Sequence, residues 1–235
     1  GRYFSQTPEQ MALKPDGDTP GDPPSAVTSA YAKPLPGGLL WRDWRFVTLS
    51  AAMALGLFAQ IGLIAHLYSL LAPALGSQQA GFGMALITGM AIAGRTLLGW
   101  TMPLKADRRL IACAGYVAQL LGSIVFYLAD GQSIPLLLAG LVLFGLGFGN
   151  ATSLPPLIAQ VEFVKADVSR AVALVVGIAQ AAYAFAPATF GLVRAFGPQL
   201  VDSSAGAAHH VFLLAALLQG LAIVAFLAGR RREPQ

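Results

Sequence analysis

The stretch from Phe46 to Gly94 reads FVTLSAAMALGLFAQIGLIAHLYSLLAPALGSQQAGFGMALITGMAIAG and contains no Asp, Glu, Lys or Arg. A helix that crosses the ~30 Å hydrocarbon core of a bilayer needs about 20 apolar residues, so this stretch is long enough for two crossings. Pro73-Ala74-Leu75-Gly76 interrupts it, as expected of a turn between two helices. We therefore predict a hairpin of two transmembrane helices.

Four further stretches are free of charged residues: 110–129, 131–161, 171–193 and 203–229. The chain is 56% apolar and only 11% charged, whereas a typical soluble domain is roughly 25% charged. The runs are apolar on both faces, which favours helices over the alternating strands of a barrel. The sequence thus predicts an all-α membrane protein with six transmembrane helices, at about 46–72, 80–102, 110–129, 134–160, 169–195 and 209–228.

The beginning of the chain differs from the rest in composition. Seven of the 15 prolines fall before residue 40, and prolines at this density prevent a continuous helix. We expect a largely irregular aqueous segment with one short helix near residues 7–10, because Thr7 suits the N-cap and Pro8 the first helical position. The predicted organisation is an aqueous segment at 1–43, a six-helix membrane domain at 44–229 and an aqueous tail at 230–235.

The 15 Lys and Arg residues lie in narrow bands between the apolar stretches. All of them except Arg194 fall on one side of the predicted membrane, and the positive-inside rule assigns that side to the cytoplasm. We therefore expect a multi-pass protein of the bacterial inner (plasma) membrane with both termini in the cytoplasm. The net charge of +4 does not indicate nucleic-acid binding, because the basic residues flank apolar helices and form no basic stripe.

Several polar side chains fall near the middle of predicted helices, where they cost free energy unless they face another helix or a cavity. Each one alone is explained by a helix-to-helix hydrogen bond, worth about 0.6 kcal/mol on average. Several helices, however, offer an amide at the same depth, which favours a central polar cavity. The residues are Gln60, Thr88, Gln119, Asn150, Gln180, Tyr183 and Gln219.

Two ionisable residues within the predicted helices stand out. Arg95 falls in the inner third of the second one, where it either extends to the cytoplasmic surface or binds a substrate carboxylate with its planar fork. His66 is the only acid–base group at depth that titrates near neutral pH, and its alternative role is a hydrogen bond in helix packing. No Asp or Glu lies in any predicted span, so the sequence offers no carboxylate proton relay.

Glycine and proline mark the later helices. Gly145 and Gly149 have the spacing of a small-residue packing face. Pro155, Pro156 and Pro187 free backbone carbonyls and bend helices. Such kinks are a trait of transporters whose helices break around a midplane site, and a static kink has the same signature.

The sequence indicates no metal site and no cofactor. Cys113 is the single cysteine, which excludes an internal disulfide and a cysteine-based metal site. His209 and His210 are adjacent, so their side chains point apart, and no third ligand accompanies them.

Four segments have counterparts in a known family. On these segments the chain resembles the carboxy-terminal half (helices 7–12) of a major facilitator superfamily transporter of the prokaryotic, monocarboxylate-transporter-like kind, and the resemblance covers essentially the whole chain. The segments are Thr7-Pro8-Glu9-Gln10 with Leu13-Lys14-Pro15-Asp16-Gly17-Asp18 (the loop between halves), Gly94-Arg95-xxx-Gly99 with Asp107-Arg108-Arg109 (the cytoplasmic motif between helices eight and nine), Asn150-Ala-Thr-Ser-Leu-Pro-Pro (helix ten) and Gln180-Ala-Ala-Tyr183-Ala-Phe-Ala-Pro187 (helix eleven).

The resemblance implies two inverted three-helix repeats that form half of a 12-helix fold, with an amino-terminal six-helix half on the same chain or on a partner chain. It places helices seven, eight, ten and eleven around the cavity and makes Gln119 and Gln219 packing residues. It also implies two sets of site residues: substrate-cavity candidates Gln60, His66, Arg95, Asn150, Thr152, Gln180 and Tyr183, and a cytoplasmic gate motif of Gly94, Gly99, Asp107, Arg108 and Arg109.

The sequence departs from the family pattern in two places. Gly99 and Asp107 are further apart than the usual motif spacing. Ala91 stands one turn before Arg95, where monocarboxylate carriers have an acidic residue.

We expect a secondary active transporter, not an enzyme, that moves a small polar or anionic organic solute, a carboxylate among the candidates, by alternating access. H+ is a candidate coupling ion. The alternatives are an intramembrane enzyme, which would need a nucleophile and base or metal ligands converging at depth, and a non-transporting membrane sensor or scaffold. Six further apolar spans ahead of Gly1 would favour the transporter over the sensor.

Overall fold

The computed structural model describes residues 38–103, 106–129, 133–200 and 207–230, and every regular element in these ranges is a helix. The prediction of an all-helical protein is confirmed for these residues. The short helix predicted at 7–10 and the loop motif at 13–18 lie outside them. The elements are a 3₁₀ helix η2 (Leu40–Arg42), α1 (Trp44–Leu75), α2 (Ser77–Thr101), α3 (Arg108–Ala129), α4 (Ile134–Phe148), α5 (Leu154–Glu162), α6 (Lys165–Tyr183), α7 (Ala186–Leu200) and α8 (Ala207–Ala228).

In the part of the chain that the structure describes, five helical stretches are long and apolar enough to cross a membrane: α1, α2, α3, α8 and the stretch Lys165–Gln199 that spans α6 and α7. Length and apolar composition in five helices are what a multi-pass membrane protein requires. The predicted hairpin is present, since Gly76 separates α1 from α2 with a φ of +79°, a conformation that favours glycine. Pro73 does not end α1 but lies inside its last turns.

The fourth predicted helix is not continuous. Residues 134–160 form α4, which has 15 residues, and the separate short helix α5. At 1.5 Å per residue α4 is about 22 Å long, shorter than a bilayer core. The division has a local cause, because Pro155 and Pro156 have no N–H to donate to the carbonyls of Ala151 and Thr152.

α1 is the central helix of the bundle. It contacts α8, α6, α7 and α2, and its spanning segment is 61% buried, against 22% for α2 and for Lys165–Gln199. α3 lies between α4 and α8, and α2 packs on α4. α2 and the α6–α7 pair are therefore at the periphery of the domain.

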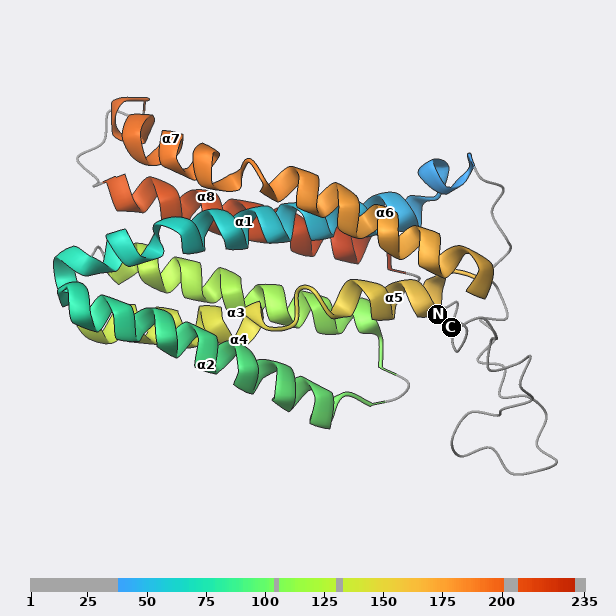
Figure 1. Cartoon of the computed structure of the whole chain (residues 1–235), viewed down its shortest axis with the longest axis horizontal. Helices are drawn as coiled ribbons and strands as arrows, with labels where there is room; N and C mark the ends of the chain where they lie inside the picture. The colour runs from blue at the N-terminus through green and yellow to red at the C-terminus, as the bar shows by residue number, and fades with distance from the viewer. Residues whose placement is uncertain (1–37, 104–105, 130–132, 201–206, 231–235) are drawn as a thin grey trace, which may run out of the picture.

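The helices run along one axis, and the charged helix ends meet at one end of the bundle (Figure 1). There lie the starts of α1, α3 and α6 and the ends of α2, α5 and α8. We call this the basic end, because its helix termini carry Arg45, Arg108, Arg109, Lys165 and Arg230. The opposite end, which we call the hairpin end, holds the α1–α2 turn, the end of α7 and the start of α8.

Candidate functional site

A cavity of about 230 Å³ lies between α1, α2, α6 and the α4–α5 break. Five residues of its wall are apolar: Met53, Leu57, Ile61, Phe148 and Val176. The other five are polar and are all among the predicted cavity candidates: Gln60, Arg95, Thr152, Gln180 and Tyr183. The structure thus brings together residues from four helical segments that are far apart in the sequence. Arg95, Thr152 and Gln180 are exposed, so the cavity opens at the surface of the domain.

Arg95 is the charged group of this cavity. Its Nε donates a hydrogen bond to the backbone carbonyl of Gly149 at 2.8 Å. Among the described residues, no side chain or carbonyl accepts from its Nη1 or Nη2, and no carboxylate pairs with it. The two terminal nitrogens are therefore available to a ligand.

Two predicted cavity candidates are not part of the wall. Asn150 is buried, and its Nδ2 donates to the carbonyl of Gly94 at 3.4 Å. His66 lies further toward the hairpin end, where its Nε2 donates to the carbonyl of Pro187 at 2.9 Å and so joins α1 to α7. The α6–α7 break is adjacent, since Pro187 has no N–H for the carbonyl of Tyr183.

A second polar contact joins the same two helices. Arg194 Nη1 donates to Ser69 Oγ at 2.6 Å, and Ser69 Oγ donates to the carbonyl of His66 at 2.7 Å. Arg194 therefore has a role in holding α7 against α1.

The remaining buried amides lie between helices. Gln60 Nε2 donates to Gln119 Oε1 at 2.7 Å, and Gln119 Nε2 donates to the carbonyl of Gly147 at 3.1 Å. Ser123 Oγ donates to Gln219 Oε1 at 2.9 Å. Gln119 and Gln219 are fully buried, in agreement with a packing role, whereas Gln60 also reaches the cavity.

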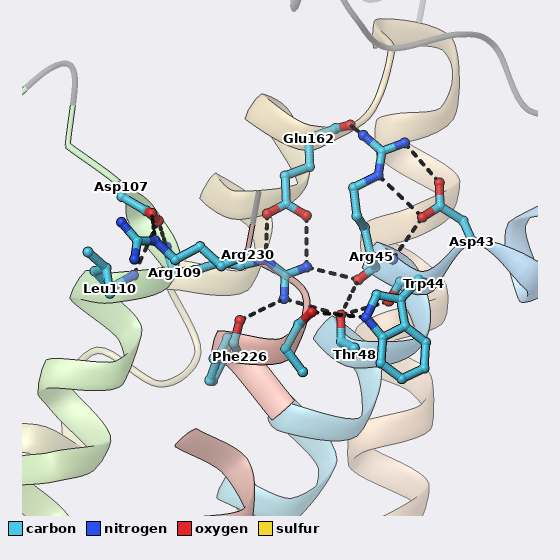
Figure 2. Close-up of polar contacts among 11 residues, drawn as sticks. Asp43, Trp44, Arg45, Thr48, Asp107, Arg109, Leu110, Glu162, Phe226 and Arg230 are labelled. Carbon is cyan, nitrogen blue, oxygen red and sulfur yellow. Dashed lines mark hydrogen bonds and ion pairs between the residues drawn. The ribbon is translucent and has the colours of Figure 1, made fainter. Parts of the chain in front are cut away.

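Arg109 is the centre of a polar cluster at the basic end (Figure 2). It is only 2% exposed, and its side chain contacts residues of three other helices, α1, α5 and α8. Nε and Nη2 donate to the two carboxylate oxygens of Glu162 at 2.5 and 2.8 Å. The other donors reach Thr48 Oγ1 (3.2 Å) and the carbonyls of Phe226 (3.2 Å) and Arg45 (2.9 Å). All five N–H groups of the guanidinium are thus used.

The predicted gate motif is dispersed around this cluster rather than gathered in one place. Asp107 Oδ1 accepts from the backbone N–H groups of Arg109 and Leu110, as an N-cap does, and its Oδ2 pairs with Arg230. Arg108 Nη1 donates to the carbonyl of Leu157 on α5 at 3.0 Å. On α2, Gly94 packs on the backbone of α4 and Gly99 faces open space.

Asp43 and Arg45 extend the cluster to the start of α1. Asp43 accepts from the backbone N–H of Arg45 at 2.8 Å and caps α1, and its carboxylate pairs with the Arg45 guanidinium at 2.9 Å. Burial acts to raise the pKa of Asp43, but the hydrogen bonds and the charge of Arg45 outweigh it, so the pKa is lowered. Arg45 Nη1 also donates to the carbonyl of Glu162, which links α1 to α5.

Sequence reasoning missed Glu162 and Thr48. Glu162 follows the fourth predicted span and Arg109 precedes the third, so antiparallel helices would place both at the same end. That was the available signal for their pairing. No group of three or more His, Cys, Asp or Glu residues that could hold a metal ion occurs in the ranges that the structure describes.

Comparison of the chain with protein-family models, with curated proteins and with solved structures finds no match.

Proposed function

We propose that the chain is the carboxy-terminal half of a secondary active transporter of the major facilitator superfamily, and that it moves a small polar or anionic organic solute by alternating access. The observation that carries this proposal is the cavity of about 230 Å³, where four polar residues from α1, α6 and the α4–α5 break line the same wall as a guanidinium with two unused donors. Such a concave site with few convergent polar groups is typical of small-molecule sites.

The helix breaks support the same function. α4 and α5 separate beside Thr152, and α6 and α7 separate beside Tyr183, and both residues line the cavity. Interrupted helices around a polar site in mid-bundle are a trait of secondary transporters, which bind their solutes there. In this proposal the α4–α5 pair counts as one crossing, which gives six crossings in two inverted three-helix repeats.

The exposed apolar faces support a larger assembly in a bilayer. α2 and the α6–α7 pair expose large side chains: Phe82, Ile92, Leu97, Trp100, Phe185 and Leu192. We propose that lipid and the amino-terminal six-helix half, on the same chain or a partner chain, cover these faces. By the positive-inside rule the basic end faces the cytoplasm of a bacterial inner membrane.

The basic end is the proposed cytoplasmic gate. Asp107 links α3 to Arg230 after α8, and Arg108 links α3 to α5, so both residues tie helices that must move together when the half rotates. Asp107→Asn combined with Arg108→Ala is expected to change the inward/outward balance and the transport rate of the intact transporter. An unchanged rate and balance would remove the gating role.

The coupling ion is open to test. Among the described residues that line the cavity only Arg95 and Tyr183 have ionisable side chains, so a proton-coupled mechanism needs a group elsewhere, for which His66 is the candidate in the described part of the chain. Uptake of a panel of small carboxylates and their neutral amides by proteoliposomes, with imposed H+ and Na+ gradients, tests the function. Uptake that is saturable, gradient-dependent and lost in Arg95→Gln supports it, whereas uptake equal to that of empty liposomes overturns it.

A further inference from the structure

The α4–α5 break presents an unused backbone carbonyl to Arg95. Through the break, Ala151 N–H donates to the carbonyl of Phe148, and Leu154 N–H donates to that of Asn150. The carbonyl of Gly149, between them, accepts from no described backbone N–H. A buried carbonyl requires a partner, and Arg95 Nε supplies it at 2.8 Å. The break in α4 and the position of Arg95 are thus parts of one arrangement.

Glycines allow the two backbones to come close enough for this bond. A Cβ at Gly149 would lie 2.0 Å from the carbonyl oxygen of Ala91, and a Cβ at Gly94 would lie 2.2 Å from that of Leu146. The packing face predicted from Gly145 and Gly149 is confirmed, since both meet the backbone of α2. Asn150 adds a second tie in the opposite direction, from its Nδ2 to the carbonyl of Gly94.

We propose that the Gly149 carbonyl and Asn150 are the positioning groups of an anion site at Arg95, and that they present its Nη1–Nη2 edge end-on to a planar carboxylate. This inference rests on the proposed function and specifies how its cavity selects a solute. Because Nε is held by Gly149, the side-on edge of the guanidinium is blocked, and the two terminal nitrogens form the remaining fork.

The Gly149 carbonyl that holds Arg95 is uncharged, and this determines the class of ligand. A carbonyl orients the guanidinium without cancelling its charge, whereas a carboxylate partner would do both. Among the described residues no carboxylate lines the cavity, so the bound solute supplies the counter-charge. The site therefore selects a small anion with a planar head group over its neutral analogue.

The first test measures equilibrium binding of benzoate and of its neutral isostere benzamide to the purified intact protein in detergent. Gly149→Ala should push α4 from α2 and weaken benzoate binding about tenfold or more, which corresponds to the free energy of one hydrogen bond to a charged group. The affinity for benzamide should change by less than about twofold, a difference smaller than RT. Gly89→Ala is the matched control, because a Cβ at Gly89 on α2 meets no atom within 4 Å. Asn150→Ala should give the same anion-specific loss to a smaller extent.

The second test adds charge next to Arg95 on α2. Ala91 lies one turn before Arg95, on the same face of α2. Ala91→Asp would place a carboxylate beside the guanidinium and should weaken benzoate binding at least about tenfold, while the isosteric Ala91→Asn should weaken it by less than about threefold, since it adds bulk but no charge. Equal losses for both substitutions would mean that charge at this position is irrelevant and would overturn the proposal.

The outcomes separate this inference from the proposed function. Benzoate binding that is lost in Arg95→Gln and weakened in Gly149→Ala, without any gradient-driven uptake, retains the anion site and rejects the transporter. Uptake that survives Gly149→Ala, Asn150→Ala and Ala91→Asp retains the transporter and rejects the positioning role. Absence of benzoate binding to the wild type, or equal affinity for benzoate and benzamide, also rejects it.

Discussion

Arg95 and Arg109 have the same side chain in opposite circumstances. Arg109 is 2% exposed, uses all five donors and holds the Glu162 carboxylate side-on through Nε and Nη2. Arg95 is exposed, uses only Nε and has a neutral carbonyl as its partner. The same residue type therefore serves a structural role where its charge is matched and a proposed binding role where it is not.

The difference follows from what each arginine meets on the neighbouring helix. Arg109 meets Glu162 at the end of α5, and burial of an ion pair is tolerated only when the remaining donors are also satisfied. Here Thr48 and the carbonyls of Arg45 and Phe226 satisfy them. Gly229 is required for the fit, because a Cβ there would lie 2.0 Å from Thr48 Oγ1 and 2.2 Å from Arg109 Nη1.

Arg109→Met should produce the largest change. It leaves Glu162 without its partner, and removal of one member of a buried ion pair costs about 3–5 kcal/mol of unfolding free energy. Unfolding of the purified protein in detergent micelles measures the loss. Arg95→Met is the matched comparison and should cost less, about 1–3 kcal/mol, because it leaves the neutral Gly149 carbonyl without its partner but no buried charge.

The double variant Arg109→Met with Glu162→Met sharpens this result. Replacement of both charged partners by apolar residues of similar size is often neutral, so the double variant should recover most of the stability lost in Arg109→Met. Equal destabilisation by Arg109→Met and Arg95→Met would contradict the distinction between the two arginines.

Arg95→Lys tests the other side of the comparison. Lysine keeps the positive charge but has no planar fork, so it cannot bond Gly149 and a carboxylate at the same time. We expect affinity for a carboxylate to fall about 10- to 100-fold, the range for a hydrogen bond to a charged group, with unfolding free energy nearly unchanged. Isothermal titration with benzoate measures the affinity, and an unchanged value would exclude a bidentate contact.

Much of this arrangement could be predicted from the sequence, because it depends on residue type and helix period. The apolar stretches located most helix segments, and the amides and Arg95 on separate segments predicted a shared polar cavity. The division of α4 was not predicted as such, although Pro155 and Pro156 signalled a bend. The two prolines leave two backbone carbonyls without their helical N–H partners. Whether the helix then bends or ends depends on whether other groups donate hydrogen bonds to these carbonyls, and the packing of the helices determines this.

The pairing of Arg109 could not be predicted for a related reason. Asp107, Glu162 and Asp167 all lie near the same end, and the choice among them depends on the rotation of α3 and α5 about their axes. Close backbone contacts with α4 at Gly122 and Gly147 fix the rotation of α3, and the short loop at residues 163–164 constrains α5 against α6. The predicted position of Arg109 at the membrane–water boundary was consistent with both a solvated and a buried side chain.

Arg194 provides an intermediate case between Arg95 and Arg109, with one side-chain partner. Its Nη1 bonds Ser69 Oγ at 2.6 Å. Arg194→Met should lower the unfolding free energy by about 1–1.5 kcal/mol, typical of one hydrogen bond. Ser69→Ala should cost a similar amount, and the double variant should cost less than the sum of the two, because both remove the same contact. Additive losses in this double-mutant cycle would show that the bond contributes nothing.

Asp43 gives the smallest expected effect and extends the comparison to a third arginine, Arg45, whose charge is matched by a carboxylate near the helix start. Because the pKa of Asp43 is lowered in the folded state, its charge stabilises the protein above the unfolded pKa of about 3.9, and this contribution is lost as the pH falls through the lowered value. Asp43→Asn keeps an N-cap acceptor without the charge, and should be less stable than the wild type at pH 7 by up to about 1 kcal/mol. The stability difference between the two proteins should begin to shrink as the pH falls below about 3.9, and should disappear only below the lowered pKa of Asp43 in the folded state. If the stability difference between the two proteins persists unchanged to pH 3, the contribution of Asp43 comes from its geometry rather than from its charge. The Asp43–Arg45 pair would then differ from the Arg109–Glu162 pair, in which the charges are matched.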